Sequence, residues 1–158
     1  MKNIMTAGLA MAALSAWPAP ATSHDKHAHE TWSAGEPGNP KMPSRTIEVE
    51  MSEMEYTPSR IEVKRGEQIR FVIRNAGKED HEFLLATTKE NLKHAEDMKK
   101  HPHMEHDDPN GVRLAPAKSA EIVWKFTHAG TFEYSCLIPD HRDYGMIGQI
   151  QVNEATVK

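Results

Sequence analysis

The sequence has little of what marks several common classes of protein. It has one cysteine, Cys136, whereas an exported chain normally carries cysteines in pairs that form disulfides. It has no basic excess, because 23 acidic and 19 basic side chains give a formal net charge of −4, and this argues against a nucleic-acid partner. The length of 158 residues suits one domain. The lone cysteine can be a buried thiol, half of an intermolecular bridge or a metal ligand.

Long hydrophobic runs are also missing, apart from a short one at the start. Lys2 precedes a mostly apolar stretch, residues 4–17, which is too short to span a bilayer. Small residues follow and offer cleavage after Ala21 or after Ser23. The alternative is an uncleaved anchor, which the lack of a following Lys or Arg stop signal disfavours. We therefore predict a cleaved signal peptide over residues 1–23, and a mature chain without a membrane span and with a net charge of −5, since only Lys2 is lost.

The rest of the chain divides into an irregular arm and a region with a period of two. Residues 24–44 are rich in His, Pro, Gly and Ser, which is typical of a flexible arm. From Arg45 onward, apolar and polar residues alternate in short segments separated by turn residues. These segments are residues 47–51, 61–63, 69–73, 81–87, 121–126, 131–136 and 149–152. The pattern predicts half-buried antiparallel strands, and so an all-β domain, a small β-sandwich, over residues 45–158.

Residues 88–116 break the alternation. Thr87 and Glu90 fit a capping box, residues 88–100 are good helix formers, and Pro102 would stop the helix. We predict one inserted helix and loop, at about 88–116, between two strands.

Three chemically distinct side chains lie together in residues 136–146. Cys136 offers a thiolate, His141 an imidazole and Met146 a thioether. Soft sulfur ligands suit Cu(I), imidazole suits both copper oxidation states, and two His with one Cys and a weak axial Met define an electron-transfer copper site. Zinc would make little use of the thioether. The second histidine must come from elsewhere: His81, which begins a predicted strand at a sandwich end, is the best candidate, and His128 in a turn is a weaker one.

The alternative is that the cysteine and histidine are ordinary residues at a strand end and that the methionine belongs to the core. The whole pattern instead resembles the cupredoxin family of small blue or green copper proteins, over about residues 45–153. The resemblance implies a Greek-key β-sandwich with one type 1 copper, for which His81 and His141 supply imidazole nitrogens, Cys136 the thiolate and Met146 a long axial bond. One departure is Glu82, since many members have Asn there to tie the ligand loops together.

More narrowly, the chain resembles periplasmic cupredoxins linked to copper tolerance. It shares with them a His-rich leader after the signal peptide, the sequence Asp80-His81-Glu82-Phe83 and a His- and Met-rich insertion. The resemblance implies that the mature protein is located in the periplasm.

Surplus histidines and methionines predict further copper sites. Cleavage after Ala21 would place His24 third, so that its ring, the free amine and two backbone nitrogens could surround Cu(II), and cleavage after Ser23 would make His24 itself N-terminal. In the insertion, residues 94, 98 and 101 would share one helix face. A solvated polar segment is the alternative in both places. The candidate ligands are His24, His27, His29, His94, Met98, His101, His103, Met104 and His106.

We therefore expect a copper protein that contributes to copper tolerance by binding Cu(I) and Cu(II) and by redox handling of the metal. The alternative is a plain electron-transfer shuttle with a periplasmic redox protein as partner, which the charged residues around His141 disfavour. An enzyme is not expected, because one short domain lacks the extra ligands of a multicopper oxidase and a binuclear copper centre needs two cysteines.

Overall fold

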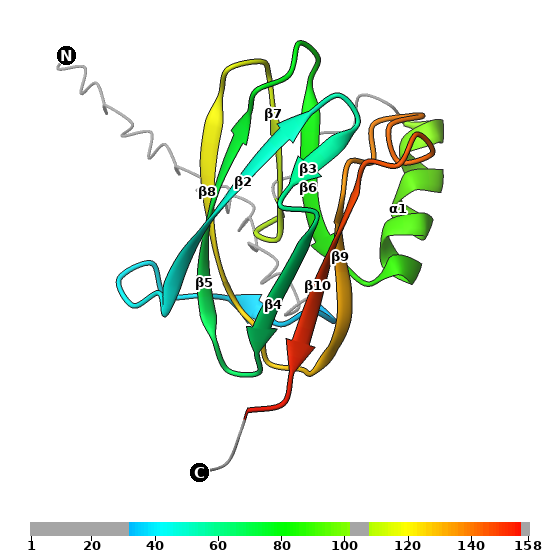
Figure 1. Cartoon of the computed structure of the whole chain (residues 1–158). Helices are drawn as coiled ribbons and strands as arrows, with labels where there is room; N and C mark the ends of the chain where they lie inside the picture. Colours follow the sequence, from blue (N-terminus) through cyan, green and yellow to red (C-terminus); the bar gives the residue numbers. More distant parts are fainter. Residues whose placement is uncertain (1–31, 102–107, 156–158) are drawn as a thin grey trace, which may run out of the picture. The chain divides into compact units, whose positions relative to one another are not determined.

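The computed structural model describes residues 32–101 and 108–155, which form a sandwich of two five-stranded sheets (Figure 1). The first sheet has the order β1 (Glu36–Pro37), β8 (Ser119–Lys125), β5 (Gln68–Asn75), β2 (Arg45–Ser52) and β3 (Glu55–Thr57). The second has the order β4 (Arg60–Lys64), β10 (Ile147–Asn153), β9 (Gly130–Ser135), β6 (His81–Ala86) and β7 (Gly111–Leu114). All seven predicted strands are present, and the Greek-key sandwich is confirmed.

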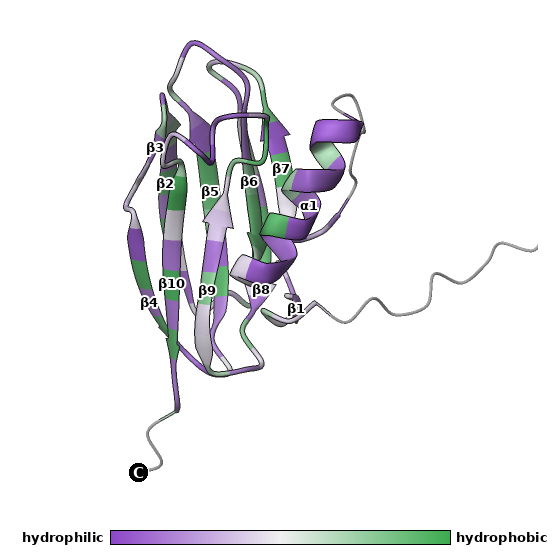
Figure 2. Cartoon of the chain, turned by 90° about the vertical axis from the view of Figure 1, so that its right-hand side faces the viewer, coloured by the Kyte–Doolittle hydropathy of each residue, from purple (hydrophilic) through white to green (hydrophobic). Residues whose placement is uncertain are grey.

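Apolar side chains that alternate with polar ones along the strands form the core. Figure 2 shows hydrophobic and hydrophilic residues alternating along the strands, and in β5 the residues Ile69, Phe71 and Ile73 are fully buried. Trp124 and Tyr134 from the other strands are among the largest side chains of the same core. Burial of apolar surface between the two sheets is the main driving force for this fold.

The strand directions correct one expectation. β2 pairs with β5, and β4 pairs with β10, in parallel orientation, whereas the other pairs are antiparallel. The period-two pattern reports that one face of a strand is buried, and this is equally true of a strand whose neighbour runs in the same direction. The pattern therefore could not exclude the parallel pairs.

The insertion contains both a helix and a strand. Helix α1 (Thr88–Lys100) begins with the predicted capping box, in which Thr87 and Glu90 bond reciprocally. It packs against the outer face of β6 and β9 and buries Asn91 and Met98, while most of its visible surface is hydrophilic (Figure 2). The later part of the insertion, predicted as loop, forms β7 by pairing with β6. No helix in the described ranges is long and apolar enough to cross a membrane.

Part of the predicted flexible arm is packed onto the sandwich. Trp32 meets Trp124 edge-on at 5.8 Å between ring centroids, and the Trp124 indole N–H donates to the carbonyl of buried Ala34 at 3.2 Å. Strand β1 then pairs with β8. The expectation of a flexible arm over residues 24–44 is therefore corrected for residues 32–44, because two aromatic rings can anchor a segment that has no periodicity. Residues 24–31 and the predicted signal peptide lie outside the described residues.

Candidate metal centre

The register of three strands brings the predicted ligands to one end of the sandwich. Ser135, the last residue of β9, lies opposite Leu84 of β6 on one side and Ile147 of β10 on the other, and both pairings are antiparallel. His81 at the start of β6 and the loop of residues 136–146 therefore lie at the same end. This confirms the expectation that the two chain segments meet.

Three side chains converge there and could hold a metal ion. One ligand atom each from His81, Cys136 and His141 all lie within 4.8 Å of one another. The Cys136 Sγ is 3.3 Å from the His141 Nδ1, and the two imidazole centroids are 5.2 Å apart. All three residues are buried. Within residues 32–101 and 108–155, no other group of three or more His, Cys, Asp or Glu side chains has this spacing.

In each of the two imidazoles, the Nε2, which we call the outer nitrogen, faces a carboxylate. His81 Nε2 is 3.5 Å from the Oε1 of Glu53, and His141 Nε2 is 3.4 Å from the Oε2 of Glu79. Neither ring nitrogen of His81 makes a hydrogen bond within the described part of the chain, although the ring is fully buried. Buried polar atoms without partners are costly. Because the Nε2 is turned toward Glu53, the Nδ1 is left for a metal ion.

The protonation states also fit a metal site. Burial raises the pKa of the Cys136 thiol to about 12, so the thiol keeps its proton at neutral pH unless a cation replaces it. Burial, together with the neighbouring His81, lowers the pKa of His141, which favours the neutral ring that binds metals. The pKa of Glu53 falls to about 2, mainly because its carboxylate accepts the Lys78 backbone N–H. One thiolate and two imidazoles form a donor set that suits copper.

The loop of residues 136–146 folds back on itself through backbone hydrogen bonds. The Cys136 N–H donates to the carbonyl of Met146 at 3.2 Å, and the Met146 N–H donates to the carbonyl of His141 at 3.1 Å. Gly145 has a φ of 101°, which other residues adopt only with strain, and this allows the tight return before β10. Met146 is fully buried at the end of the loop. The loop thus closes around the cysteine and histidine.

Glu82 ties the two ligand segments together, although it stands where many cupredoxins have Asn. Its carboxylate Oε2 accepts the Leu137 backbone N–H at 3.1 Å, and its own N–H donates to the Cys136 Sγ at 3.4 Å. Its carbonyl accepts the hydroxyl of Tyr56 at 2.5 Å. A carboxylate therefore connects β6 to the loop of residues 136–146, which we call the ligand loop.

Asn75 fixes the segment that leads to His81, a role that the sequence did not reveal. Its buried amide nitrogen donates to the carbonyls of Glu79 at 2.7 Å and Leu114 at 2.8 Å, and its Oδ1 accepts the Gly77 N–H at 2.9 Å. The sequence indicated only a turn there. A turn residue cannot be distinguished by type from an Asn whose amide organises a ligand-bearing loop.

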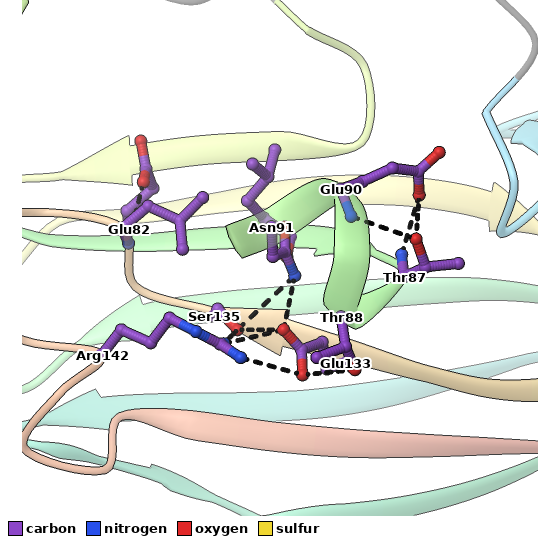
Figure 3. A network of polar contacts seen from close by, with 10 residues as sticks. Glu82, Thr87, Thr88, Glu90, Asn91, Glu133, Ser135 and Arg142 are labelled. Atoms are coloured by element: carbon purple, nitrogen blue, oxygen red, sulfur yellow. Dashed lines mark hydrogen bonds and ion pairs between the residues drawn. The ribbon is translucent and has the colours of Figure 1, made fainter. Parts of the chain in front are cut away.

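A buried carboxylate behind the ligand loop collects several donors (Figure 3). The Glu133 Oε1 lies 2.7 Å from the Arg142 Nη1, and both side chains are about nine-tenths buried. The carboxylate also accepts hydrogen bonds from two residues of helix α1, the Thr88 hydroxyl at 3.0 Å and the Asn91 Nδ2 at 3.2 Å. The Arg142 Nη1 donates to the Ser135 hydroxyl at 2.6 Å. The network therefore joins helix, strand and loop.

The position of this network in the chain gives it importance for the metal centre. Arg142 follows His141, and Ser135 precedes Cys136, so the Glu133–Arg142 ion pair and the Arg142–Ser135 hydrogen bond hold the residues next to two candidate ligands. The alternating pattern placed Glu133 and Ser135 on the solvent face of β9. Helix α1 covers that face, and this is why the sequence did not identify them.

The remaining predicted ligands are not assembled in the same way. In helix α1, Met98 is buried and His94 is half-buried, and His101, which caps the C-terminus of the helix, is exposed, so the predicted common face is partly turned toward the sheet. His128 is exposed in the turn before β9, at the strand end opposite Cys136, and this excludes it as the second histidine ligand. The other predicted ligands lie outside the described residues: His24, His27, His29, His103, Met104 and His106.

Comparison with known proteins agrees with this chemistry. Residues 44–153 match the family model described as copper binding proteins, plastocyanin/azurin family. The chain is 44% identical over 164 residues to the copper-resistant cuproprotein CopI of Rubrivivax gelatinosus, with 96% of this chain and 99% of that protein covered. It is 36% identical over 147 residues to the protein of the same name from Pseudomonas aeruginosa, with 75% and 81% covered.

Solved structures share the fold at low sequence identity. Auracyanin B superimposes with a TM-score of 0.61 at 19% identity, covering 76% of this chain and 96% of that one. A dithionite-reduced auracyanin from Roseiflexus castenholzii gives a TM-score of 0.60 at 20% identity, covering 73% and 100%. At this identity the likeness establishes the sandwich fold alone.

We predict that breaking the buried ion pair destabilises the domain. Glu133→Gln leaves the Arg142 charge without its partner and should lower the free energy of unfolding by about 3–5 kcal/mol. Urea denaturation of the metal-free protein, followed by circular dichroism, measures this. The control is Glu154→Gln, which breaks the exposed 2.8 Å pair with Arg65 and should change stability by less than about 1 kcal/mol. Equal effects of the two variants would show that the buried network carries no special stability.

Proposed function

We propose that this chain, which belongs to the plastocyanin/azurin family of copper-binding proteins, is a type 1 copper protein that contributes to copper tolerance. Its copper ligands in this proposal are His81, Cys136, His141 and Met146. The observation that carries it is the buried cluster of one thiol and two imidazoles, in a chain similar over almost its whole length to one copper-resistant cuproprotein. Bound copper would supply a one-electron couple between Cu(II) and Cu(I).

The residues of the site suit both oxidation states of copper. The thiolate and the thioether are soft ligands that favour Cu(I), whereas the two imidazoles bind either state. The loop of residues 136–146 and the Glu82 carboxylate hold the protein side in one arrangement, so that little rearrangement would accompany a change of charge on the metal. This supports redox handling of copper at the site.

Copper tolerance also gives a use to the surplus ligands. We propose additional copper binding at His24, His27 and His29 of the leader, and around His94, His101 and His103 of the insertion. Met98, Met104 and His106 complete the candidate set. Tolerance requires capacity as well as affinity, and a protein that only carried electrons would have no use for these residues.

The second candidate function is a plain electron shuttle. The surroundings of His141 disfavour it, because a shuttle is expected to present an apolar docking patch at its exposed ligand. Here the outer nitrogen of His141 faces Glu79, and Asp140 and Asp143 are exposed nearby in the sequence. Tyr144, which is 71% exposed, is an aromatic side chain in this loop that could contribute to such a patch. Fast electron exchange with a purified periplasmic cytochrome would favour the shuttle.

Location and activity complete the proposal. The N-terminal segment supports export to the periplasm after cleavage of residues 1–23, where excess copper would be met before it enters the cell. One short domain with one cysteine supports a role in binding and redox handling of copper rather than an enzymatic one.

The ligand assignment predicts the spectrum of a cysteine variant. Cys136→Ser removes the thiolate and should abolish the intense visible thiolate-to-copper absorption of the copper-loaded protein, while far-ultraviolet circular dichroism shows that the sandwich remains folded. Ser59→Ala is a matched control outside the site and should leave the absorption unchanged. Persistence of the band in Cys136→Ser would refute the assignment.

The capacity hypothesis predicts the stoichiometry of copper binding. Titration of the mature, metal-free protein with Cu(II) should give a thiolate band that saturates at one equivalent, followed by further tight binding without new visible colour. Equilibrium dialysis with metal analysis counts the ions. Binding that stops at one equivalent would contradict the additional sites and favour the shuttle.

Copper tolerance itself is tested in the source organism. Deletion of the gene should reduce growth at elevated copper and leave growth at ordinary copper unchanged. The wild-type gene should restore growth, and the Cys136→Ser gene should not restore it fully. Equal growth of the deletion strain and its parent across copper concentrations would argue against the proposed role.

A further inference from the structure

We propose that Glu53 and Glu79 are positioning residues that hold the outer Nε2–H groups of the two imidazole ligands and thereby favour Cu(II) over Cu(I) at the site. This inference rests on the proposed function, because it concerns the same copper ligands. It adds two residues from outside the ligand loop, to which neither the motif nor the resemblance assigned a role.

The geometry is the same on both sides of the site. Glu53, in the turn between β2 and β3, brings its Oε1 to 3.5 Å from the His81 Nε2. Glu79, in the segment before β6, brings its Oε2 to 3.4 Å from the His141 Nε2. Each imidazole thus has one nitrogen near a carboxylate and the other available on the side of the Cys136 thiol. Both distances can shorten into hydrogen bonds with a small movement of the side chains.

Backbone groups hold the Glu53 carboxylate in place. Its Oε1 accepts the N–H of Lys78 and, at 3.1 Å, the N–H of Glu79. The two proposed positioning residues are therefore connected directly, because the backbone of one binds the side chain of the other. The ring of His81 is fully buried, and its Nε2 has no hydrogen bond within the described residues, so the nearby carboxylate is its available acceptor.

Gly77 leaves the space that this contact needs. A Cβ at this position would lie 2.5 Å from the Glu53 Oε1 and 2.9 Å from the His81 Nε2. Both distances are too short for real contacts, so any other residue would push the carboxylate away from the ring. The absence of a side chain at Gly77 is therefore a second observation that supports the contact between the carboxylate and the imidazole.

The chemical consequence follows from charge. A carboxylate that accepts the outer N–H of a metal-binding histidine fixes the ring orientation and tautomer, and it raises the basicity of the ring as a ligand. Two negative charges near the metal also stabilise the more highly charged ion. Both effects are larger for Cu(II) than for Cu(I). The pair of carboxylates should therefore lower the reduction potential and help the protein to retain oxidised copper.

The test compares three isosteric variants of the full mature chain. Glu53→Gln keeps an oxygen that can accept the Lys78 and Glu79 N–H groups, and Glu79→Gln alters a side chain that is 59% exposed, so both should fold. Asp143→Asn is the matched control: it removes the same charge from the ligand loop, and the residue is exposed and makes no ion pair or hydrogen bond within the described part of the chain. Affinities for Cu(II) and for Cu(I), and the midpoint potential, are measured for each.

We expect each Glu→Gln variant to lose about tenfold in Cu(II) affinity relative to Cu(I), which for a one-electron couple raises the midpoint potential by about 59 mV. Asp143→Asn should shift the potential much less, because its charge does not touch an imidazole. Shifts in both Glu→Gln variants no larger than that of Asp143→Asn would overturn the proposal.

A second measurement needs no copper. Nitrogen NMR of the metal-free protein should show both His81 and His141 as the Nε2–H tautomer, and Nδ1–H forms would overturn the proposal. The outcomes remain distinct from those of the proposed function. If the wild-type protein shows the thiolate-to-copper band but the Glu→Gln variants leave the relative copper affinities and the potential unchanged, only the inference is refuted. If the wild-type protein lacks that band, the proposed function is refuted.

Discussion

The hydrogen-bonded position of β9 between β6 and β10 is the constraint on which the metal centre depends. A slip of one residue along β9 would turn every side chain of the strand to the opposite face and would carry Cys136 away from His81. Close packing fixes the register. Gly148 of β10 lies opposite Tyr134 of β9, and a Cβ at this glycine would lie 2.0 Å from the tyrosine ring. The tyrosine hydroxyl also donates to the Pro58 carbonyl at 2.5 Å, so the ring is held both at its edge and at its hydroxyl.

Carboxylates then anchor the ligand segments to this frame from several directions. Glu82 binds the ligand loop from β6, and Glu133 binds Arg142 and helix α1 from behind. Buried charges are costly unless every partner is in place, so such networks support one arrangement strongly and alternatives poorly. A rigid protein frame would limit the rearrangement that accompanies a change in the charge of a bound metal. The inserted helix contributes because it shields the outer face of β9 from water.

Much of the fold could be predicted from the sequence, because the information is local. The strands follow from alternation, and helix α1 follows from the capping box at Thr87 and the helix formers after it. The strands β1, β3 and β7 are only two to four residues long and have no periodicity to recognise. Their existence depends on a partner strand, such as β8 for β1. The parallel pairs were missed for the same reason, since direction is a property of two strands.

The sequence by itself determined the donor chemistry of the centre. A single cysteine, with a histidine and a methionine spaced along one loop, already indicates copper, because the preference of the metal depends on ligand atoms and not on the fold. Only the tertiary structure showed that His81, and not His128, lies beside them, because the register between the strands determines which strand ends coincide. It also decided that Glu53 and Glu79 lie beside the imidazoles. An acidic residue in a turn looks the same in sequence whether it faces water or a ligand, and only packing distinguishes the two.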